Sequence, residues 1–227
     1  MNLLRQTSIN GLLAIGMTFV VLTGGIDLSV GSIVGASGMF AALVAKSENN
    51  LPWYVAALVG ISVGLLLGIL NGVIISYLKV PAFIATLGML SIARGITYMA
   101  SDARPVPGLS EDFLKIGGGN IGPIPIPVII LVIVLVICYI LLYRHRYGRY
   151  VFATGGNALA ARVSGIKVKK IVCSVYMISG LLAGLAGVIL TSRVTSGLAQ
   201  SGQNYETDAI AAAVIGGNSL AGGRGRL

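Results

Sequence analysis

Charged side chains are scarce in this sequence. Asp, Glu, Lys and Arg together make up 10% of the 227 residues, whereas about 25% is usual in soluble domains. Hydrophobic residues make up 56%, and the mean hydropathy is +0.91. This composition excludes an ordinary soluble globular domain and places the chain in a lipid bilayer.

Cysteine and histidine are also rare, with two cysteines and one histidine in the chain. Cys138 and Cys173 lie within apolar runs, so no disulfide framework is expected. His145 lies in a basic loop, where we expect it to be solvated. The sequence contains no nucleophile–base pair, no cluster of metal ligands and no G-x-x-x-x-G-K-[ST] phosphate loop. We therefore expect no catalytic site, no metal site and no cofactor bound by this chain.

Long apolar runs are abundant. Because unpaired backbone groups are costly in hydrocarbon, runs without alternating polarity predict helices. We expect these helices at Ile9–Thr23, Val30–Ala45, Tyr54–Leu78, Ala82–Ala100, Pro125–Leu142, Ile171–Leu190 and Ile210–Ile215. The first, second and last are short for a full span, which needs about 20 residues. The predicted fold is an all-α, polytopic membrane protein with short broken or re-entrant helices.

The net charge of +9 comes largely from one connection, residues 144–170, which carries seven basic residues and no acidic one. The connections Ser101–Gly122 and Ser192–Thr207 carry acidic residues instead. The basic residues are concentrated in one loop between apolar runs, which indicates topology, so nucleic acid is not an expected partner. The positive-inside rule places the 144–170 loop in the cytoplasm, within a single transmembrane domain covering residues 1–227.

Glycine recurs at every fourth position in the third apolar run, at Gly60, Gly64, Gly68 and Gly72. This spacing lines one helix face with small residues and predicts close packing against a neighbouring helix. Gly180 and Gly184 repeat the pattern in a later run, and we expect both sets to serve packing.

The stretch TGGIDLSVGS interrupts the apolar sequence near its start. Gly24 and Gly25 are expected to end the first helix. For Asp27 and Ser29 two interpretations stay open. One is that either side chain caps the next helix, and the other is that the carboxylate marks a transport path inside the membrane.

A similar stretch, GGNSLAGG at Gly216–Gly223, aligns with GGIDLSVG at Gly24–Gly31. Paired glycine-interrupted segments indicate internal repeats and a midplane site, although a match this short also arises by chance. Arg94 has two interpretations, snorkelling or a polar path. The candidates for the path or the helix breaks are Gly24, Gly25, Asp27, Ser29, Asn71, Arg94, Gly216, Gly217 and Asn218.

Within the basic loop, GGNALAARVSG predicts a short exposed helix. Asn157 is a suitable N-cap, Ala158–Val163 contains strong helix formers, and Gly165 is a suitable C-terminal stop. A small-residue helix of this kind suits docking into a groove of another protein. The alternative is a basic linker that binds anionic lipid.

Four collinear stretches resemble the permease subunit of ribose-type monosaccharide ATP-binding-cassette importers: GMTFVVLTGGIDLSVGS, PAFIATLGML, GRYVFATGGNALAARVSGI and YETDAIAAAVIGGNSLAGGRG. The resemblance implies an inner-membrane subunit that pairs with a second permease copy. It also implies a cytoplasmic ATPase subunit that hydrolyses ATP, and an external sugar-binding protein. Family members usually carry further helices at both ends, so the chain is expected to be truncated.

The resemblance also implies that the loop helix couples the chain to the ATPase. Importer permeases of the wider superfamily carry E-A-A followed by Gly in this loop. Ala160, Ala161 and Gly165 match that pattern, but Leu159 stands where the Glu would be. The expected coupling residues are Gly156, Asn157, Ala160, Ala161, Arg162 and Gly165.

Three alternatives to a sugar permease follow from the same residues. A branched-chain amino-acid importer permease belongs to the same superfamily. An ATPase-independent channel or carrier would need many intramembrane ionisable residues, and only Asp27 and Arg94 are candidates. A membrane scaffold would bind partners without driving turnover.

Overall fold

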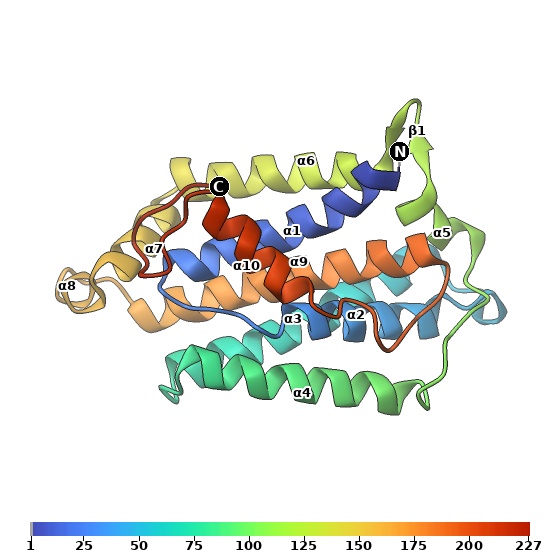
Figure 1. Cartoon of the computed structure of the whole chain (residues 1–227), viewed down its shortest axis with the longest axis horizontal. Coiled ribbons are helices and arrows are strands. Elements are labelled where there is room, and N and C mark those ends of the chain that lie inside the picture. The colour runs from blue at the N-terminus through green and yellow to red at the C-terminus, as the bar shows by residue number, and fades with distance from the viewer. Residues whose placement is uncertain (1) are drawn as a thin grey trace.

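A computed structural model describes residues 2–227, and the described chain is helical over most of its length (Figure 1). The α-helices are α1 (Asn2–Leu22), α2 (Val30–Ala45), α3 (Trp53–Ser76), α4 (Ala82–Ala100), α5 (Glu111–Gly118), α6 (Ile126–Tyr139), α7 (Arg146–Gly156), α8 (Ala158–Val163), α9 (Val168–Val194) and α10 (Tyr205–Ile215). The shorter elements are η1 (Ser47–Asn49), η2 (Ile140–Arg144), β1 (Asn120–Ile121) and β2 (Ile124–Pro125). The two strands pair antiparallel.

The predicted all-α membrane architecture is confirmed. Four helical segments are long and apolar enough to cross a bilayer: Trp53–Ser76, Ala82–Ala100, Ile126–Arg144 and Val168–Val194. Both cysteines are free, as predicted. Helix α1 begins at Asn2, before the predicted apolar run, and has 21 residues, but it is not one of the four segments apolar enough to cross a bilayer. Its first two turns are polar but compatible with a helix, so an apolar-run criterion misses them.

Helix α9 is the centre of the bundle and packs against α1, α2, α3 and α5. Helix α6 lies against α1 on one side, and α4 lies against α2 and α3 on the other (Figure 1). Helices α2 and α10 have only 16 and 11 residues. Each begins inside the bundle, so the predicted short broken helices are present.

The glycines of α3 form the contact with α9, as the four-residue spacing predicts. A Cβ atom at Gly64 would lie 2.6 Å from the Cα atom of Gly184. A Cβ atom at Gly68 would lie 2.5 Å from the carbonyl oxygen of Tyr176. The two helices therefore touch through their main chains, and only glycine fits at these positions.

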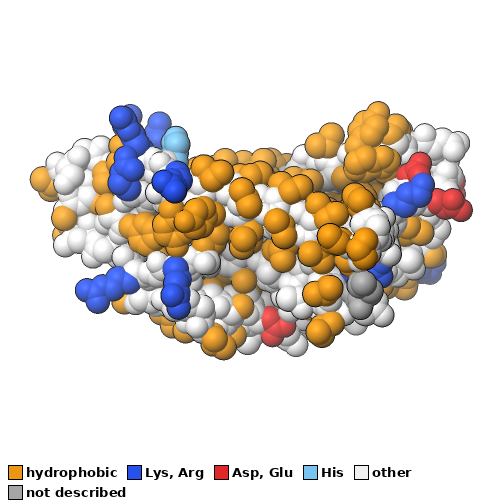
Figure 2. All heavy atoms as spheres, turned by 90° about the horizontal axis from the view of Figure 1, so that it is seen from above, with side chains coloured by type: hydrophobic (Ala, Val, Ile, Leu, Met, Phe, Trp, Pro, Cys, Tyr) orange, Lys and Arg blue, Asp and Glu red, His pale blue; other side chains and the backbone are white. Residues whose placement is uncertain are grey.

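Charge is separated between the two ends of the molecule (Figure 2). At the end that carries α7 and α8 this view shows Lys and Arg without Asp or Glu, whereas most of the Asp and Glu lie at the opposite end, together with further Lys and Arg. The apolar middle between them is exposed, which suits contact with lipid. We call the two ends the basic end and the acidic end, and the cytoplasmic location of the basic end stays a prediction.

The connection between α9 and α10 is not an external loop throughout. After Val194 the chain turns back into the bundle, and Glu206 in the first turn of α10 lies against Gly31 in the first turn of α2. Gly31 is 14 residues before the end of α2, so it lies about 21 Å from the acidic end of that helix at 1.5 Å per residue. Glu206 therefore lies within the depth of the bundle and not in an external loop.

The contact between α3 and α9 predicts the effect of adding one methyl group. Gly64→Ala forces the two main chains apart and is expected to lower the free energy of unfolding by about 1–3 kcal/mol. Thermal unfolding in detergent measures this change. Gly88→Ala on α4 is the control, because a Cβ atom there has no neighbour within 4 Å. An equal melting temperature for the two variants would contradict the contact.

Candidate functional site

The first helix break begins with a Schellman motif. The Gly24 N–H donates to the Val21 carbonyl at 2.8 Å, and the Gly25 N–H donates to the Val20 carbonyl at 3.2 Å. Gly24 adopts a φ of 77°, which favours glycine. The prediction that these two glycines end the first helix is confirmed, and residues 23–29 then cross from α1 to α2 without helical structure.

Asp27 lies within this break and is fully buried. Its carboxylate accepts hydrogen bonds from the Ser29 N–H at 3.0 Å and from the Ser29 hydroxyl at 2.6 Å. It also accepts one from the Ser179 hydroxyl of α9 at 3.0 Å. Ser29 occupies the N-cap position of α2, but its side chain makes no capping bond. The capping interpretation therefore fails for Ser29 but fits Asp27, whose carboxylate accepts a main-chain N–H at the start of α2. The interpretation of Asp27 as part of a transport path stays a prediction.

Asn71 joins the same network from α3. Its side-chain N–H donates to the Ser29 hydroxyl at 2.8 Å, and the residue is fully buried. Its Oδ1 atom is buried without a hydrogen-bond partner among residues 2–227. A buried acceptor without a partner is costly. Three elements thus place polar side chains around one buried carboxylate, which we call the Asp27 network: Asp27, Ser29, Asn71 and Ser179.

The second break follows α10 and ends that helix with the same motif. The Gly217 N–H donates to the Val214 carbonyl at 2.9 Å, and the Asn218 N–H donates to the Ala213 carbonyl at 3.2 Å. Gly217, with a φ of 99°, occupies the position that Gly24 has after α1. The sequence alignment paired Gly24 with Gly216 instead, so it is displaced by one residue. Whether the two halves are repeats stays a prediction.

Asn218 stabilises the second break through both ends of its amide. The side-chain N–H donates to the carbonyls of Ala213 and Arg226, at 2.8 and 2.9 Å. The side-chain oxygen accepts from the Arg226 N–H at 3.1 Å. Asn218 is buried. It therefore holds the chain after Gly217 in a closed turn, without direct contact with Asp27.

The two breaks meet each other and the end of α7. The Gly223 N–H donates to the Leu22 carbonyl at 2.9 Å. A Cβ atom at Gly222 would lie 2.8 Å from the Gly24 nitrogen, and one at Gly155 would overlap the Leu22 carbonyl. We call these five residues the glycine junction. The sequence predicted both breaks but not that they touch.

Helix α8 has the predicted bounds and ends. The Asn157 side-chain oxygen accepts from the N–H groups of Leu159 and Ala160, both at 3.0 Å. A Schellman motif closes the helix at Gly165, whose φ is 85°. Ala161 is buried, whereas Gly156, Asn157, Ala160, Arg162 and Gly165 are exposed. The helix projects from the basic end of the bundle (Figure 1).

The side chain of Arg94 does not extend toward the acidic end of the molecule. Its guanidinium Nη1 donates to the carbonyls of Ala199 and Ser201 in the segment before α10. A Cβ atom at Gly35 of α2 would lie 2.9 Å from Nη1. The interpretation of Arg94 as a snorkelling residue is therefore wrong, because the side chain points into the bundle between α2 and α4.

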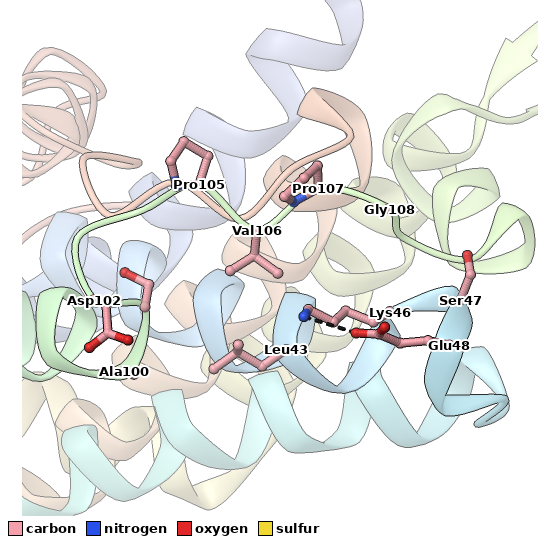
Figure 3. Close-up of a pocket in the computed structure, with 11 residues that line it drawn as sticks. Leu43, Lys46, Ser47, Glu48, Ala100, Asp102, Pro105, Val106, Pro107 and Gly108 are labelled. Atoms are coloured by element: carbon pink, nitrogen blue, oxygen red, sulfur yellow. Dashed lines mark hydrogen bonds and ion pairs between the residues drawn. The ribbon is translucent and has the colours of Figure 1, made fainter.

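A hollow of about 550 Å³ opens at the acidic end, between the end of α2 and residues 100–108 (Figure 3). Lys46 and Glu48 form an ion pair of 3.0 Å at its rim, and Asp102 lies on the opposite wall. Sequence reasoning missed this hollow. It depends on long-range pairing of Lys46 with Leu109 and of Val106 with Gly197.

The fold and the two breaks define a polytopic membrane permease. A family profile described as the permease component of the branched-chain amino acid transport system matches residues 1–223. The chain is 46% identical to the ribose import permease protein of Haemophilus influenzae, over 100% of this chain and 71% of that protein. It is 43% identical to the D-allose transport system permease protein of Escherichia coli, over 98% and 68%.

A third relative is the xylose transport system permease protein of Haemophilus influenzae, which is 35% identical over 100% of this chain and 76% of that protein. No solved structure matches the chain. The extent of the profile match and of the pairwise identities shows that the chain belongs to this family of ATP-binding-cassette permeases. It is a multi-pass protein of the bacterial inner membrane.

The Asp27 network predicts a measurable loss of stability when one donor is removed. Ser179→Ala leaves the Asp27 carboxylate with one hydrogen bond fewer, so the free energy of unfolding should fall by about 1–3 kcal/mol. The melting temperature in detergent reports the change. Ser91→Ala is the control, since Ser91 is exposed on α4 and its bond to Leu87 is long, at 3.5 Å. Equal stability of the two variants would contradict the network.

Proposed function

We propose that this chain is the membrane-spanning permease subunit of an ATP-binding-cassette importer that moves a monosaccharide. The relatives that support this proposal are named as ribose, D-allose and xylose permeases, although the family description names branched-chain amino acids. The single observation that carries it is the identity of 46% over the full chain with a ribose import permease. The substrate class therefore follows these relatives and not the family description.

The unequal charge of the two ends supports a proposed position for each partner. A cytoplasmic ATPase subunit docks at the basic end, and an extracytoplasmic sugar-binding protein delivers the sugar at the acidic end. A second permease copy completes the membrane assembly. The chain itself binds no nucleotide and no cofactor, and the partner ATPase hydrolyses ATP.

Helix α8 offers the ATPase an apolar face. Leu159 and Val163 are four residues apart, which places them on one side of the helix. Their side chains are 75% and 90% exposed, although both are apolar. Exposed apolar side chains on a short, well-capped helix suit insertion into a groove of a partner protein. Flanking lysines add attraction to anionic lipid at the same end.

Movement of α8 reaches the helix breaks through the glycine junction. Helix α7 leads into α8, and Gly155 in its last turn lies against Leu22 and Gly223. The Tyr147 hydroxyl is within 2.8 Å of the Ser174 hydroxyl and fastens α7 to α9. Burial raises the pKa of Tyr147 to about 12, so this contact stays neutral at physiological pH. ATP-driven closure of the ATPases would therefore tilt α7 about Tyr147 and displace both breaks.

Reconstitution tests the proposed function. The subunit is purified from the membrane with its partners and placed in proteoliposomes with the sugar-binding protein. Uptake of radiolabelled ribose, allose and xylose is compared with uptake of leucine, with and without ATP. ATP-dependent uptake of a sugar supports the proposal. Uptake of leucine alone, or uptake without ATP, would reject it.

Coupling is tested at Gly165. Gly165→Val forces a β-branched residue into a φ of 85° and should distort the end of α8. We expect at least about a tenfold loss of sugar-stimulated ATPase activity, which corresponds to about 1.4 kcal/mol, with normal membrane insertion. Gly108→Val is the matched control, because Gly108 has a similar φ of 76° but lies at the acidic end. Coupling that is equally preserved in both variants would reject a role for α8.

A further inference from the structure

A second cavity lies deeper than the hollow at the acidic end. Its volume is about 270 Å³, and it is lined by the first turn of α2, the second half of α4 and the turn before and at the start of α10, with one side open to the surface. Most of its lining is polar. The residues are Ser32, Leu90, Arg94, Tyr98, Gln200, Gln203, Asn204 and Glu206.

The cavity lies within the depth of the bundle. Arg94 is six residues before the end of α4, so it lies about 9 Å from the acidic end of that helix. Ser32 is 13 residues before the end of α2, about 20 Å from the acidic end. Ionisable side chains at such depths face the interior of a bundle or a water-filled cavity, and they mark transport paths.

The glycines of α2 create room for both charged groups. A Cβ atom at Gly31 would overlap the carboxylate of Glu206, and one at Gly35 would lie 2.9 Å from the Arg94 guanidinium. Both charged groups therefore lie directly against the main chain of α2, where no Cβ atom separates them from it. The cavity thus has a basic and an acidic wall, and the two charges balance.

Several polar side chains of the cavity lining make no hydrogen bond within residues 2–227. Arg94 makes its hydrogen bonds through Nη1 alone, and the side chains of Gln203 and Glu206 make none among residues 2–227. The same holds for the side chains of Gln200 and Asn204 within the described chain. Arg94 and Glu206 are half-buried, whereas Gln200, Gln203 and Asn204 are exposed. Donors and acceptors of both kinds therefore remain available to a molecule in the cavity.

We propose that this cavity holds the hydroxyl groups of the transported sugar during its passage, an inference that rests on the proposed function. A sugar is a neutral molecule whose hydroxyls each donate and accept. Amides, a carboxylate and a guanidinium serve both roles, and balanced charge disfavours the binding of a lone ion. Tyr98 and Leu90 supply an apolar surface for the carbon face of the ring, whereas a branched aliphatic side chain would need a larger apolar wall.

The floor of the cavity leads directly to the Asp27 network. The Ser32 hydroxyl donates to the Ser29 carbonyl at 2.8 Å. The Ser29 hydroxyl in turn donates to the Asp27 carboxylate. A sugar that contacts Ser32 is therefore one hydrogen bond away from Ser29, the last residue of the first break. Displacement of that break by α7 would open or close the route below the cavity.

The experiment uses the complete transporter in proteoliposomes, with its ATPase and its sugar-binding protein. Gln203→Ala and Glu206→Gln are compared with Ser91→Ala, a control on α4 that lies outside the lining of the cavity. We expect sugar uptake to fall at least about tenfold, as loss of one or two hydrogen bonds allows. ATPase stimulation by the loaded binding protein should change less than about twofold, and co-purification of the ATPase verifies folding.

Deoxy sugars distinguish a direct hydrogen bond between Gln203 and the sugar from a purely structural role of Gln203. The unchanged transporter and Gln203→Ala are each assayed with the transported sugar and its monodeoxy analogues. If Gln203 contacts one hydroxyl, the analogue that lacks this hydroxyl is taken up more slowly than the sugar by the unchanged transporter. In Gln203→Ala the same analogue and the sugar should be taken up at equal rates. Unchanged uptake, or an equal fall for all sugars, would overturn the site while leaving the proposed function intact. Failure of the unchanged transporter to take up any sugar would overturn both.

Discussion

The main-chain contact between α3 and α9 is the constraint on which the rest of the structure depends. With no side chains between Gly64 and Gly184, the two helices are as close as their backbones allow. Asn71 and Ser179 each adjoin a glycine of this contact. Their short side chains can therefore reach the same break from opposite helices. A wider separation would leave the Asp27 carboxylate buried without enough donors, which is unfavourable in an apolar interior.

Local features of the fold were predictable because each depends on residues close in sequence. The limits of α8 follow from an N-cap at Asn157 and a glycine at 165, and the α3 contact follows from a four-residue spacing. The return of the chain before α10 was not predictable. Hydropathy senses the length of an apolar run, whereas a polar turn inside a membrane requires protein partners from distant helices. Arg94 supplies two of those bonds from α4.

Three helices end in the same way, and the three ends have different surroundings. Schellman motifs close α1, α8 and α10 at Gly24, Gly165 and Gly217. The first and third lead into breaks inside the bundle, whereas the second is exposed at the basic end. The motif itself therefore identifies a helix end but not a function. The candidate site required distances between segments, which is why sequence alone left the role of Asp27 open between two interpretations.

The glycine junction is made almost wholly by main-chain atoms, with Leu22, Gly155 and Gly223 in direct contact. An interface of that kind holds no side chain that substitution could reshape. Under the proposed docking of α8 on the ATPase, substitutions on its exposed face change the surface offered to the partner, whereas the main-chain contact behind it keeps its form. A change of ATPase partner would then require new side chains on α8 but no change in the main-chain contact between α7 and the two helix breaks.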